Sequence, residues 1–317
     1  MKKEHLFLSM LVLIVFISGC QGSSGFSSAG PNGVQIKFIQ PKDTIVNEGS
    51  SVPIEIEITN HAECNVLGTL CVRDTLSDSF GGLNEQCKGI NLGEARTNNK
   101  NIEIDLDKFF PVSQPYTNLF VDQSTDIIAN AKYSCDIVTG PSGVCTKSPF
   151  NTDNPQCPTS EIISGNDLGS KAAPVTVTRI DKSISGSQND LKLNLDIELR
   201  KMDKGRISSN EESQDSNLKG YPIKIEVDYA GNQMNCKGQD YKDGILYWKA
   251  TNTNPERIIN CEILLNSGIY QKDPVNIHLN YVYEISESKT INIKNIAYSQ
   301  LKNKKGYLRI NNLFKLN

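Results

Sequence analysis

Strict alternation of apolar and polar residues is the feature of this sequence that most restricts its fold. Residues 52–59 alternate as VPIEIEIT, and residues 191–200 alternate as LKLNLDIELR. The same period recurs at residues 102–107, 223–228 and 275–283. Successive side chains of a β-strand point to opposite faces, whereas a helix would distribute these apolar residues around its circumference. The pattern therefore predicts an all-β protein of antiparallel strands that are buried on one face.

The number of these strands and the length of the chain predict two domains. Short antiparallel strands separated by turns rich in Gly, Pro, Asn and Ser are typical of β-sandwiches. A chain of 317 residues is longer than one small sandwich needs. We therefore expect two tandem antiparallel β-sandwich domains, the first at residues 33–147 and the second at residues 173–295.

Three polar segments lie between, within and after these domains. Residues 148–172 are rich in turn-forming residues, which predicts a linker or a loop stapled to the first domain. Residues 201–217 have no apolar period and predict a solvated loop inside the second domain. Residues 296–317 carry four lysines and one arginine without an acidic residue. This basic tail is compatible with a final strand, a short helix or a disordered end.

The N-terminus has the pattern of a secretory signal. Lys2 and Lys3 precede a mostly apolar run at residues 6–18, which is shorter than the roughly 20 residues of a membrane-spanning helix. The end of this run and the two residues after it, Ile17-Ser18-Gly19-Cys20, resemble the lipobox of prokaryotic lipoproteins, in which the cysteine becomes the lipidated N-terminus. The resemblance implies a lipoprotein signal peptide at residues 1–19. An ordinary signal peptide and an uncleaved short anchor are the alternatives.

The residues after this signal predict a tether. Residues 20–32 begin at Cys20 and continue as QGSSGFSSAGPN, which offers almost nothing to bury and is typical of a flexible coil. Two lipid chains on Cys20 would hold the folded body at the membrane, because a single chain binds only reversibly. We therefore expect a cell-surface protein that membrane lipid anchors through Cys20, on the extracellular side.

Cysteine usage supports an exported protein. Removing Cys20 from the nine cysteines leaves eight, an even number that favours disulfides. No two cysteines have C-x-x-C spacing and only three histidines occur, which disfavours a structural zinc site. Sequence alone leaves the connectivity open. Positions in the predicted strands and loops favour three pairs: Cys236 with Cys261, Cys71 with Cys87, and Cys145 with Cys157. Cys64 and Cys135 are the two cysteines that remain, and they form the fourth pair.

The sequence contains no recognisable catalytic motif, since G-x-S-x-G, H-E-x-x-H, the P-loop and the dinucleotide fingerprint are all missing. His61 precedes Cys64 by three residues, but we expect Cys64 in a disulfide rather than in a nucleophilic dyad. His278 falls on the polar phase of its strand, and Trp248 is expected in the core. The formal net charge of −3 gives no basic footprint for nucleic acid. We predict a non-enzymatic protein without a cofactor.

One row of acidic residues raises the alternative of calcium binding. Glu103, Asp105 and Asp107 share one face of a predicted strand. Calcium takes about six to eight oxygen ligands, many of them from loops, and a carboxylate row is also what a solvated strand face looks like. We therefore assign no metal ligand, and keep calcium binding as an alternative.

The order of these segments resembles that of a family of surface proteins. The lipobox and tether lead to GVQIKFIQP, VPIEIEITNHAE and NVLGTLCVRDT, which resemble the first strands of Ig-like and fibronectin-III-like modules in archaeal surface lipoproteins. The resemblance covers residues 1–150 and brings no catalytic residue. A bond between Cys64 and Cys135 would resemble the bridge between the sheets of immunoglobulin domains.

The anchor, the tether and the strand pattern together predict a non-enzymatic role in adhesion, envelope structure or display. The expected partner is then an unknown surface protein or glycan. A solute- or calcium-binding surface lipoprotein is the alternative, and an accessory domain of an extracellular hydrolase is a second one. A solute-binding lipoprotein is usually α/β, and no long amphipathic helix is evident in the sequence.

Overall fold

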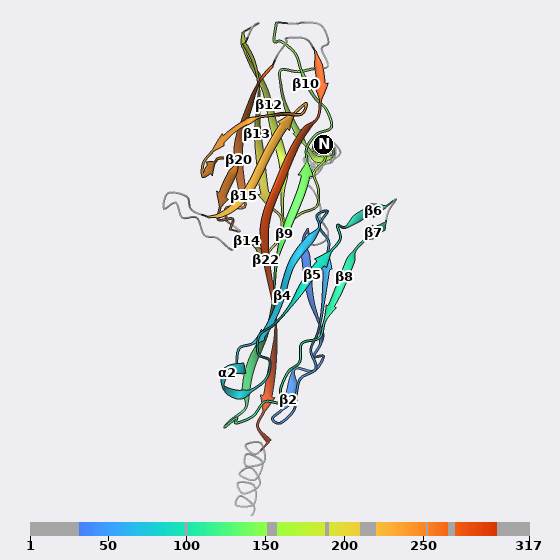
Figure 1. Ribbon diagram of the computed structural model, residues 1–317, viewed down its shortest axis with the longest axis vertical. Helices are drawn as coiled ribbons and strands as arrows, with labels where there is room; N and C mark the ends of the chain where they lie inside the picture. The colour runs from blue at the N-terminus through green and yellow to red at the C-terminus, as the bar shows by residue number, and fades with distance from the viewer. Residues whose placement is uncertain are drawn as a thin grey trace, which may run out of the picture.

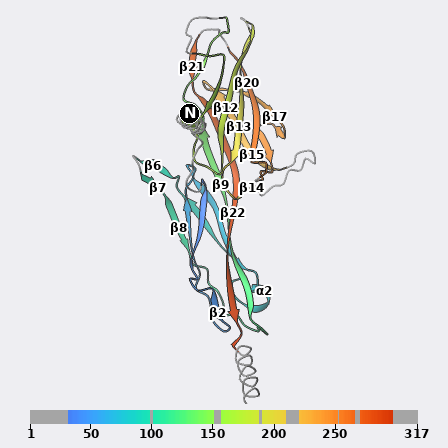
Figure 2. The same ribbon diagram turned by 180° about the vertical axis from the view of Figure 1, so that it is seen from behind.

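The computed structural model describes residues 32–98, 101–150, 157–187, 190–209, 220–251, 253–265 and 270–296. Within these ranges the chain is almost entirely strand, and all strand pairs but one are antiparallel. The all-β prediction is therefore confirmed. Figures 1 and 2 show an elongated molecule with two lobes, which we name the lower and the upper lobe after their places in Figure 1. No helix in the described part of the chain is long and apolar enough to span a membrane.

A ten-stranded central sheet runs through both lobes. Its main strands, in spatial order, are β18 (Tyr241–Lys242), β19 (Ile245–Trp248), β15 (Tyr221–Tyr229), β22 (Val275–Lys294), β9 (Gln123–Thr139), β4 (Val66–Asp74) and β5 (Gln86–Leu92). The three short strands at its margins are β14 (Arg206–Ser208) and β2 (Ile45–Asn47), which pair with β22, and β16 (Asn232–Gln233), which pairs with β15. The long strands β9 and β22 are neighbours and pass from one lobe into the other (Figure 1).

Each lobe has a smaller sheet of its own. The lower lobe has a three-stranded sheet of β1 (Val34–Gln40), β3 (Glu55–Asn60) and β8 (Asp105–Phe109). The upper lobe has a five-stranded sheet of β11 (Ser160–Ser164), β12 (Val175–Ser187), β13 (Asp190–Lys201), β20 (Glu256–Leu265) and β17 (Asn235–Gly238). Separate two-stranded pairs are β10 (Val144–Thr146) with β21 (Gln271–Asp273) and β6 (Arg96–Asn98) with β7 (Asn101–Glu103). The helical turns are α2 (Ser77–Phe80) and the 3-10 helix η1 (Gly165–Leu168).

Buried and exposed side chains alternate along β9 and β22, and this alternation fixes the register in which the two strands pair. Residues 277–293 of β22 pair with residues 123–139 of β9 without a shift in register. Alternate side chains of both strands point into the interior, where the buried apolar residues of the two lobes form one cluster. Because a slip of one residue would turn every buried side chain to solvent, this pattern holds the register.

The predicted segments 33–147 and 173–295 share the central sheet, in addition to the smaller sheet of each lobe. The first segment contributes β4, β5 and β9, and the second contributes β15 and β22. Residues 160–164, predicted as part of a linker, form β11 and bury Ile163. Residues 206–208, predicted as part of a solvated loop, form β14 and bury Ile207. Residues 1–31 and 297–317, with the predicted signal, most of the tether and nearly all of the basic tail, lie outside the described residues.

Gly68 of β4 lies opposite Tyr133 of β9, and we expect Gly68→Ala to destabilise the protein by about 1–3 kcal/mol through overpacking. A Cβ atom there would lie 2.1 Å from the backbone oxygen of Lys132 and 2.6 Å from the Cα atom of Tyr133. Gly89 in β5 is a matched control, because a Cβ atom there would meet no heavy atom within 4 Å. Urea denaturation of both variants checks this, and an equal midpoint for the two would contradict the close approach.

Candidate functional site

The described cysteines form four disulfides. The bonds join Cys64 to Cys135, Cys71 to Cys87, Cys145 to Cys157, and Cys236 to Cys261. These are the four pairs that the sequence analysis favoured, including the one reached as the remainder. Two of them join directly opposite residues of neighbouring strands, on β4–β5 and on β17–β20. Cys20, the predicted lipidation site, lies outside the described residues.

The bond between Cys64 and Cys135 joins the two layers of the lower lobe. Cys64 lies in the loop after β3 of the small sheet, and Cys135 lies on β9 of the central sheet. Both residues are buried. Asn60 holds the loop in place, because its Nδ2 donates to the backbone oxygens of Cys64 and Gly93, each at 2.8 Å. A sulfur bonded in this way cannot act as a thiolate, so Cys64 and His61 form no nucleophilic dyad.

The two described histidines occupy different environments. His61 lies 3.1 Å from the hydroxyl of Thr59 through Nε2, and burial lowers the pKa of His61 although the charge of Asp203 opposes this shift. His278 is on the outer face of β22, as its phase predicted, and its Nε2 contacts the carboxylate of Asp136. The Nδ1 of His278 lies 3.7 Å from a carboxylate oxygen of Glu226.

Two residues of the acidic row considered for calcium, Asp105 and Asp107, already form contacts within the protein. An oxygen of Asp107 lies 2.6 Å from the Lys88 ammonium. Burial raises the pKa of Asp107, but the hydrogen bonds from Lys88 and from the Lys108 N–H outweigh it and hold that pKa below its usual value. Asp105 accepts the Gly93 N–H at 2.8 Å. The side chain of Glu103 is outside the described ones.

One described cluster brings three potential metal-ligand atoms within 4.8 Å of one another: Cys71, Glu85 and Cys87. Both of its sulfur atoms are bonded to each other in a disulfide. A cysteine binds a metal as its thiolate, and these two cysteines are oxidised, so this cluster offers only the carboxylate of Glu85 as a ligand.

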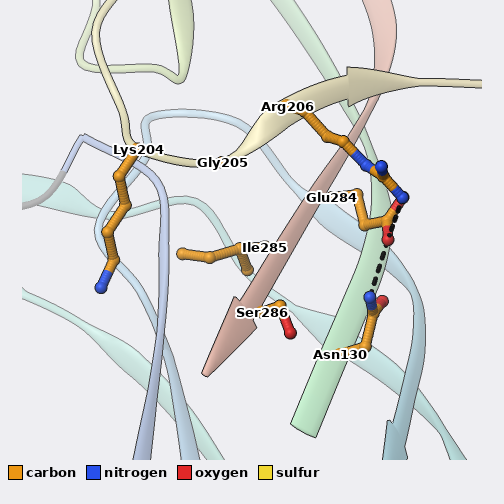
Figure 3. A pocket seen from close by; sticks show the side chains of 7 residues that line it. All are labelled: Asn130, Lys204, Gly205, Arg206, Glu284, Ile285 and Ser286. Carbon is orange, nitrogen blue, oxygen red and sulfur yellow. Dashed lines mark hydrogen bonds and ion pairs between the residues drawn. The ribbon is translucent and has the colours of Figure 1, made fainter. Parts of the chain in front are cut away.

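A hollow lies on the outer face of the central sheet at the waist, the region where β9 and β22 pass between the lobes. It has a volume of about 430 Å³ and is lined by Asn130, Lys204, Gly205, Arg206, Glu284, Ile285 and Ser286. Figure 3 shows Arg206 and Asn130 converging on the carboxylate of Glu284, with Lys204 on the other side of the hollow. Arg206 donates to Glu284 at 2.8 and 2.9 Å through Nη2, and Asn130 donates to it at 2.7 Å.

The charged side chains of this hollow form ion pairs. Burial raises the pKa of Glu284, but the hydrogen bonds from Arg206 and Asn130 and the charge of Arg206 outweigh it, so that pKa lies below its usual value. The Lys204 ammonium contacts Glu287. The arrangement therefore clamps β14 onto β22, with Arg206 paired to Glu284 and Lys204 to Glu287.

A second, larger hollow of about 650 Å³ opens beside His278 on the upper lobe. Its polar side chains come from β15, β16 and β22, and several of them are already paired. Asp228 accepts a hydrogen bond from Asn276 at 3.1 Å, and Glu226 is 2.8 Å from the Lys224 ammonium. Glu226, Gln233 and Asn276 of its lining are exposed to solvent, whereas small-molecule sites are enclosed and mostly apolar.

Three buried tyrosines fill the interior of the waist. Tyr133 and Tyr283 are opposite each other on β9 and β22, with ring centroids 6.1 Å apart, and Tyr281 packs edge-on against Tyr283. The Tyr281 hydroxyl lies 3.0 Å from both the N–H and the C=O of Val175 on β12, and the Tyr133 hydroxyl accepts the Val34 N–H of β1 at 3.3 Å. Burial raises the pKa of all three phenols, so they stay neutral. These hydroxyls tie the small sheet of each lobe to the central sheet.

Asp203 faces this interior from the segment between β13 and β14. Its backbone oxygen accepts the Tyr283 hydroxyl at 3.0 Å, and its Oδ1 accepts the Lys204 N–H at 2.7 Å. Its Oδ2 is buried without a hydrogen-bond partner in the described chain. Burial raises the pKa of Asp203, opposed by the Lys204 N–H and by the charges of Lys204, Lys201 and His61.

We expect Asp203→Asn to stabilise the protein at neutral pH, by up to about 1–3 kcal/mol, because a neutral amide costs less to bury than a carboxylate. A carboxyl whose pKa is raised by folding contributes stability below its unfolded pKa, and this contribution is lost as the pH rises through the folded pKa. The advantage of Asp203→Asn should therefore be small below about pH 4 and grow above it. Urea unfolding at several pH values measures it, with the exposed Asp43→Asn as the control. A difference that does not depend on pH would contradict a raised pKa.

Sequence reasoning anticipated the disulfides, the surface position of His278 and the buried Trp248. It missed the waist, which depends on pairing between distant strands. The alternation of residues 275–283 indicates that Tyr281 and Tyr283 face the core. Asp203 lies in a polar segment without an apolar period, so nothing in the sequence indicates that it is buried. The chain matches no protein-family model, and no curated protein matches it in sequence. Any functional assignment for this protein therefore depends on its sequence signals and its own geometry.

Proposed function

We propose that this protein is a lipid-anchored cell-surface protein with a non-enzymatic role in adhesion, envelope structure or display. In this proposal residues 1–19 are a lipoprotein signal, Cys20 carries the lipid, and residues 20–32 tether the body on the extracellular side. An unknown surface protein or glycan is the partner. The proposal takes the protein to be archaeal, from the resemblance of its first 150 residues.

The observation that carries this proposal is the elongated body built on β9 and β22. Seventeen consecutive residue pairs join these strands, from Ile277–Thr139 to Ile293–Gln123. A continuous ladder with disulfide-stapled lobes at both ends suits a spacer or display module, since it transmits load along its length. The described hollows have paired charges, which suits such a module better than a reaction centre.

We further propose that each lobe is an Ig-like or fibronectin-III-like sandwich. The inter-layer bond between Cys64 and Cys135 supports this for the lower lobe. In the upper lobe, the five-stranded sheet lies against β15 and β22 and is tied to them through Tyr281 and Val175. The two sandwiches would then be arranged in tandem but would share the central sheet.

Membrane fractionation of cells that produce the wild type and Cys20→Ser tests the proposal. We expect the wild type in the membrane fraction, where protease added to intact cells digests it. Cys20→Ser should remove the lipid and shift the protein out of the lipid-anchored pool, with Cys236→Ser as a control for cysteine loss elsewhere. A wild type that intact cells protect from protease would contradict surface display. Cross-linking on intact cells then identifies the partner.

A further inference from the structure

Strand β11 forms an open edge of the five-stranded sheet in the upper lobe, because β12 is its only partner among the described strands. Ile184 of β12 donates its N–H at 2.8 Å to the backbone oxygen of Thr159, which directly precedes β11. Hydrogen-bonded and non-hydrogen-bonded pairs alternate along an antiparallel ladder. Every second residue of β11 therefore bonds to β12, and the backbone groups of Ser160, Ile162 and Ser164 are directed to the open edge.

This edge is not blocked in the usual ways. The side chains of these three residues are exposed, Ile162 by 62%. An edge strand is a template for pairing with another chain, and proteins commonly block it with lysine, proline or a very short strand. β11 contains neither lysine nor proline. By contrast, Lys88 of edge strand β5 bonds to the backbone oxygen of Lys108 on edge strand β8 at 2.8 Å, and edge strand β18 has two residues.

The residue order of β11 fits a second copy of the same strand. On the exposed face it reads Ser160, Ile162, Ser164, which is the same in both directions. A two-fold axis at Ile162 would set two copies antiparallel, with each Ile162 opposite the other and each Ser160 opposite a Ser164. On the inner face, Glu161 would lie opposite Ile163 of the second copy. No like charges would therefore meet directly across the new strand pair.

A hollow of about 430 Å³ opens beside this edge, between β11 and the loop that joins β9 to β10, and its two ends carry opposite charges. Lys272 lies at one end, where a Cβ atom on Gly143 would be 2.7 Å from its Cε. Asp167 lies on η1 at the other end, where a Cβ atom on Gly169 would be 2.7 Å from the backbone oxygen of Gly140. Both charged side chains are exposed, and neither forms an ion pair with another described residue.

The two-fold axis would exchange these ends. Asp167 follows the C-terminal end of β11. Lys272 pairs with Cys145, whose backbone oxygen is 2.9 Å from the ammonium of Lys182, and Lys182 lies opposite Glu161 near the start of β11. Antiparallel pairing would therefore bring Lys272 of each copy towards Asp167 of the other. This charge complementarity, together with the order of β11, selects a second copy of the chain as the occupant of the edge.

We propose that this chain forms a two-fold symmetric dimer in which the β11 edges of two copies pair antiparallel about Ile162. The five-stranded sheets of the two upper lobes then continue into one another. Two-fold dimers are the commonest protein oligomers, and they use the same patch on both subunits. The dimer goes beyond the proposed function and does not require the lipid anchor.

Cysteine cross-linking of the purified full-length chain tests this pairing. Opposite Cα atoms of a hydrogen-bonded pair are about 5.5 Å apart, which a disulfide can span. We expect mild oxidation to convert Ile162→Cys into a disulfide-linked dimer. Ile258→Cys, at a position 56% exposed on β20 of the same sheet, is the matched control and should stay monomeric. Both variants and the wild type contain Cys20, so any bond through Cys20 appears equally in all three.

Sedimentation equilibrium of charge variants provides a second test. Ile162→Lys would set two ammonium groups opposite each other at the axis, and we expect it to weaken dimerisation by about tenfold. Because the side chain of Ile162 is exposed in the monomer, the urea midpoint should stay that of the wild type. Lys272→Glu should also weaken the dimer, and the double variant of Lys272→Glu with Asp167→Lys should restore it.

Four results would overturn the proposal. The first is a wild type that sediments as a monomer together with an absence of cross-linking at position 162. The second is equal cross-linking at positions 162 and 258, which random collision explains. The third is a dimer that Ile162→Lys leaves unchanged, which would place the interface on another face. The fourth is a cross-link on intact cells from position 162 to a different protein without a homodimer, which would make an extended segment of that protein the occupant.

Discussion

Glu161→Ala is expected to lower the free energy of unfolding by about 3–5 kcal/mol, as is usual when one partner of a buried ion pair is removed. The side chain of Lys182 is fully buried, and its ammonium lies 2.6 Å from the Glu161 carboxylate and 2.9 Å from the backbone oxygen of Cys145. Glu161 is the only carboxylate that forms an ion pair with it in the described chain. Without Glu161, the interior of the upper lobe would hold an uncompensated charge.

A double-mutant cycle separates this effect from the loss of packing. Lys182→Met in the Glu161→Ala background removes the stranded charge and should recover much of the loss, because apolar replacements of buried ion pairs are often tolerated. The exposed pair Arg179–Asp181, on the same strand, is the control, and Asp181→Ala should cost less than about 1 kcal/mol. Urea denaturation measures Glu161→Ala, Lys182→Met, the double variant and Asp181→Ala. Equal costs for Glu161→Ala and Asp181→Ala would show that Lys182 is solvated.

Replacing both Cys64 and Cys135 with alanine is expected to lower the free energy of unfolding by about 4 kcal/mol in the chain-entropy description. The bond joins residues separated by 71 positions and ties two layers together. The Cys71–Cys87 bond spans 16 positions on neighbouring strands, so its removal should cost less, about 3 kcal/mol. Unfolding without reductant compares the two double variants. A larger loss for the Cys71–Cys87 variant would contradict the structural role given to the inter-layer bond.

Strands with a strong local period were predictable from the sequence. Residues 191–200 alternate without interruption, and β13 occupies almost the same positions. The cysteine pairs were narrowed correctly because most of them join residues close in the chain or opposite on neighbouring strands. Trp248 was placed in the core by its phase with Leu246, and both side chains are fully buried.

The joining of the lobes was not predictable in this way. The second half of β22 reads EISESKTINIK, where Glu287 and Lys289 occupy the phase of the core and obscure the alternation. Pairing between β22 and β9 joins residues more than 130 positions apart, and no local period reveals such a partner. The same reason hides β14, which is only three residues long and gains its stability from β22.

The candidate sites were less predictable than the strands. Lys182 shares the inward phase of Ile180 and Ile184, which is the one signal that its side chain is buried, but its partner Glu161 lies in a segment predicted as a linker. The environment of Asp203 depends on residues far from it in the chain, among them Tyr283 and His61. A charged side chain in a strand is normally solvated, so pattern alone assigns such residues to the surface.

Mass spectrometry of the mature N-terminus tests the surface-lipoprotein claim most directly. The protein is purified from its native membrane, and its N-terminal peptide is sequenced and weighed. We predict a chain that begins at Cys20 and carries lipid on that residue. An unmodified N-terminus, or one that begins at any residue other than Cys20, would contradict the lipid anchor.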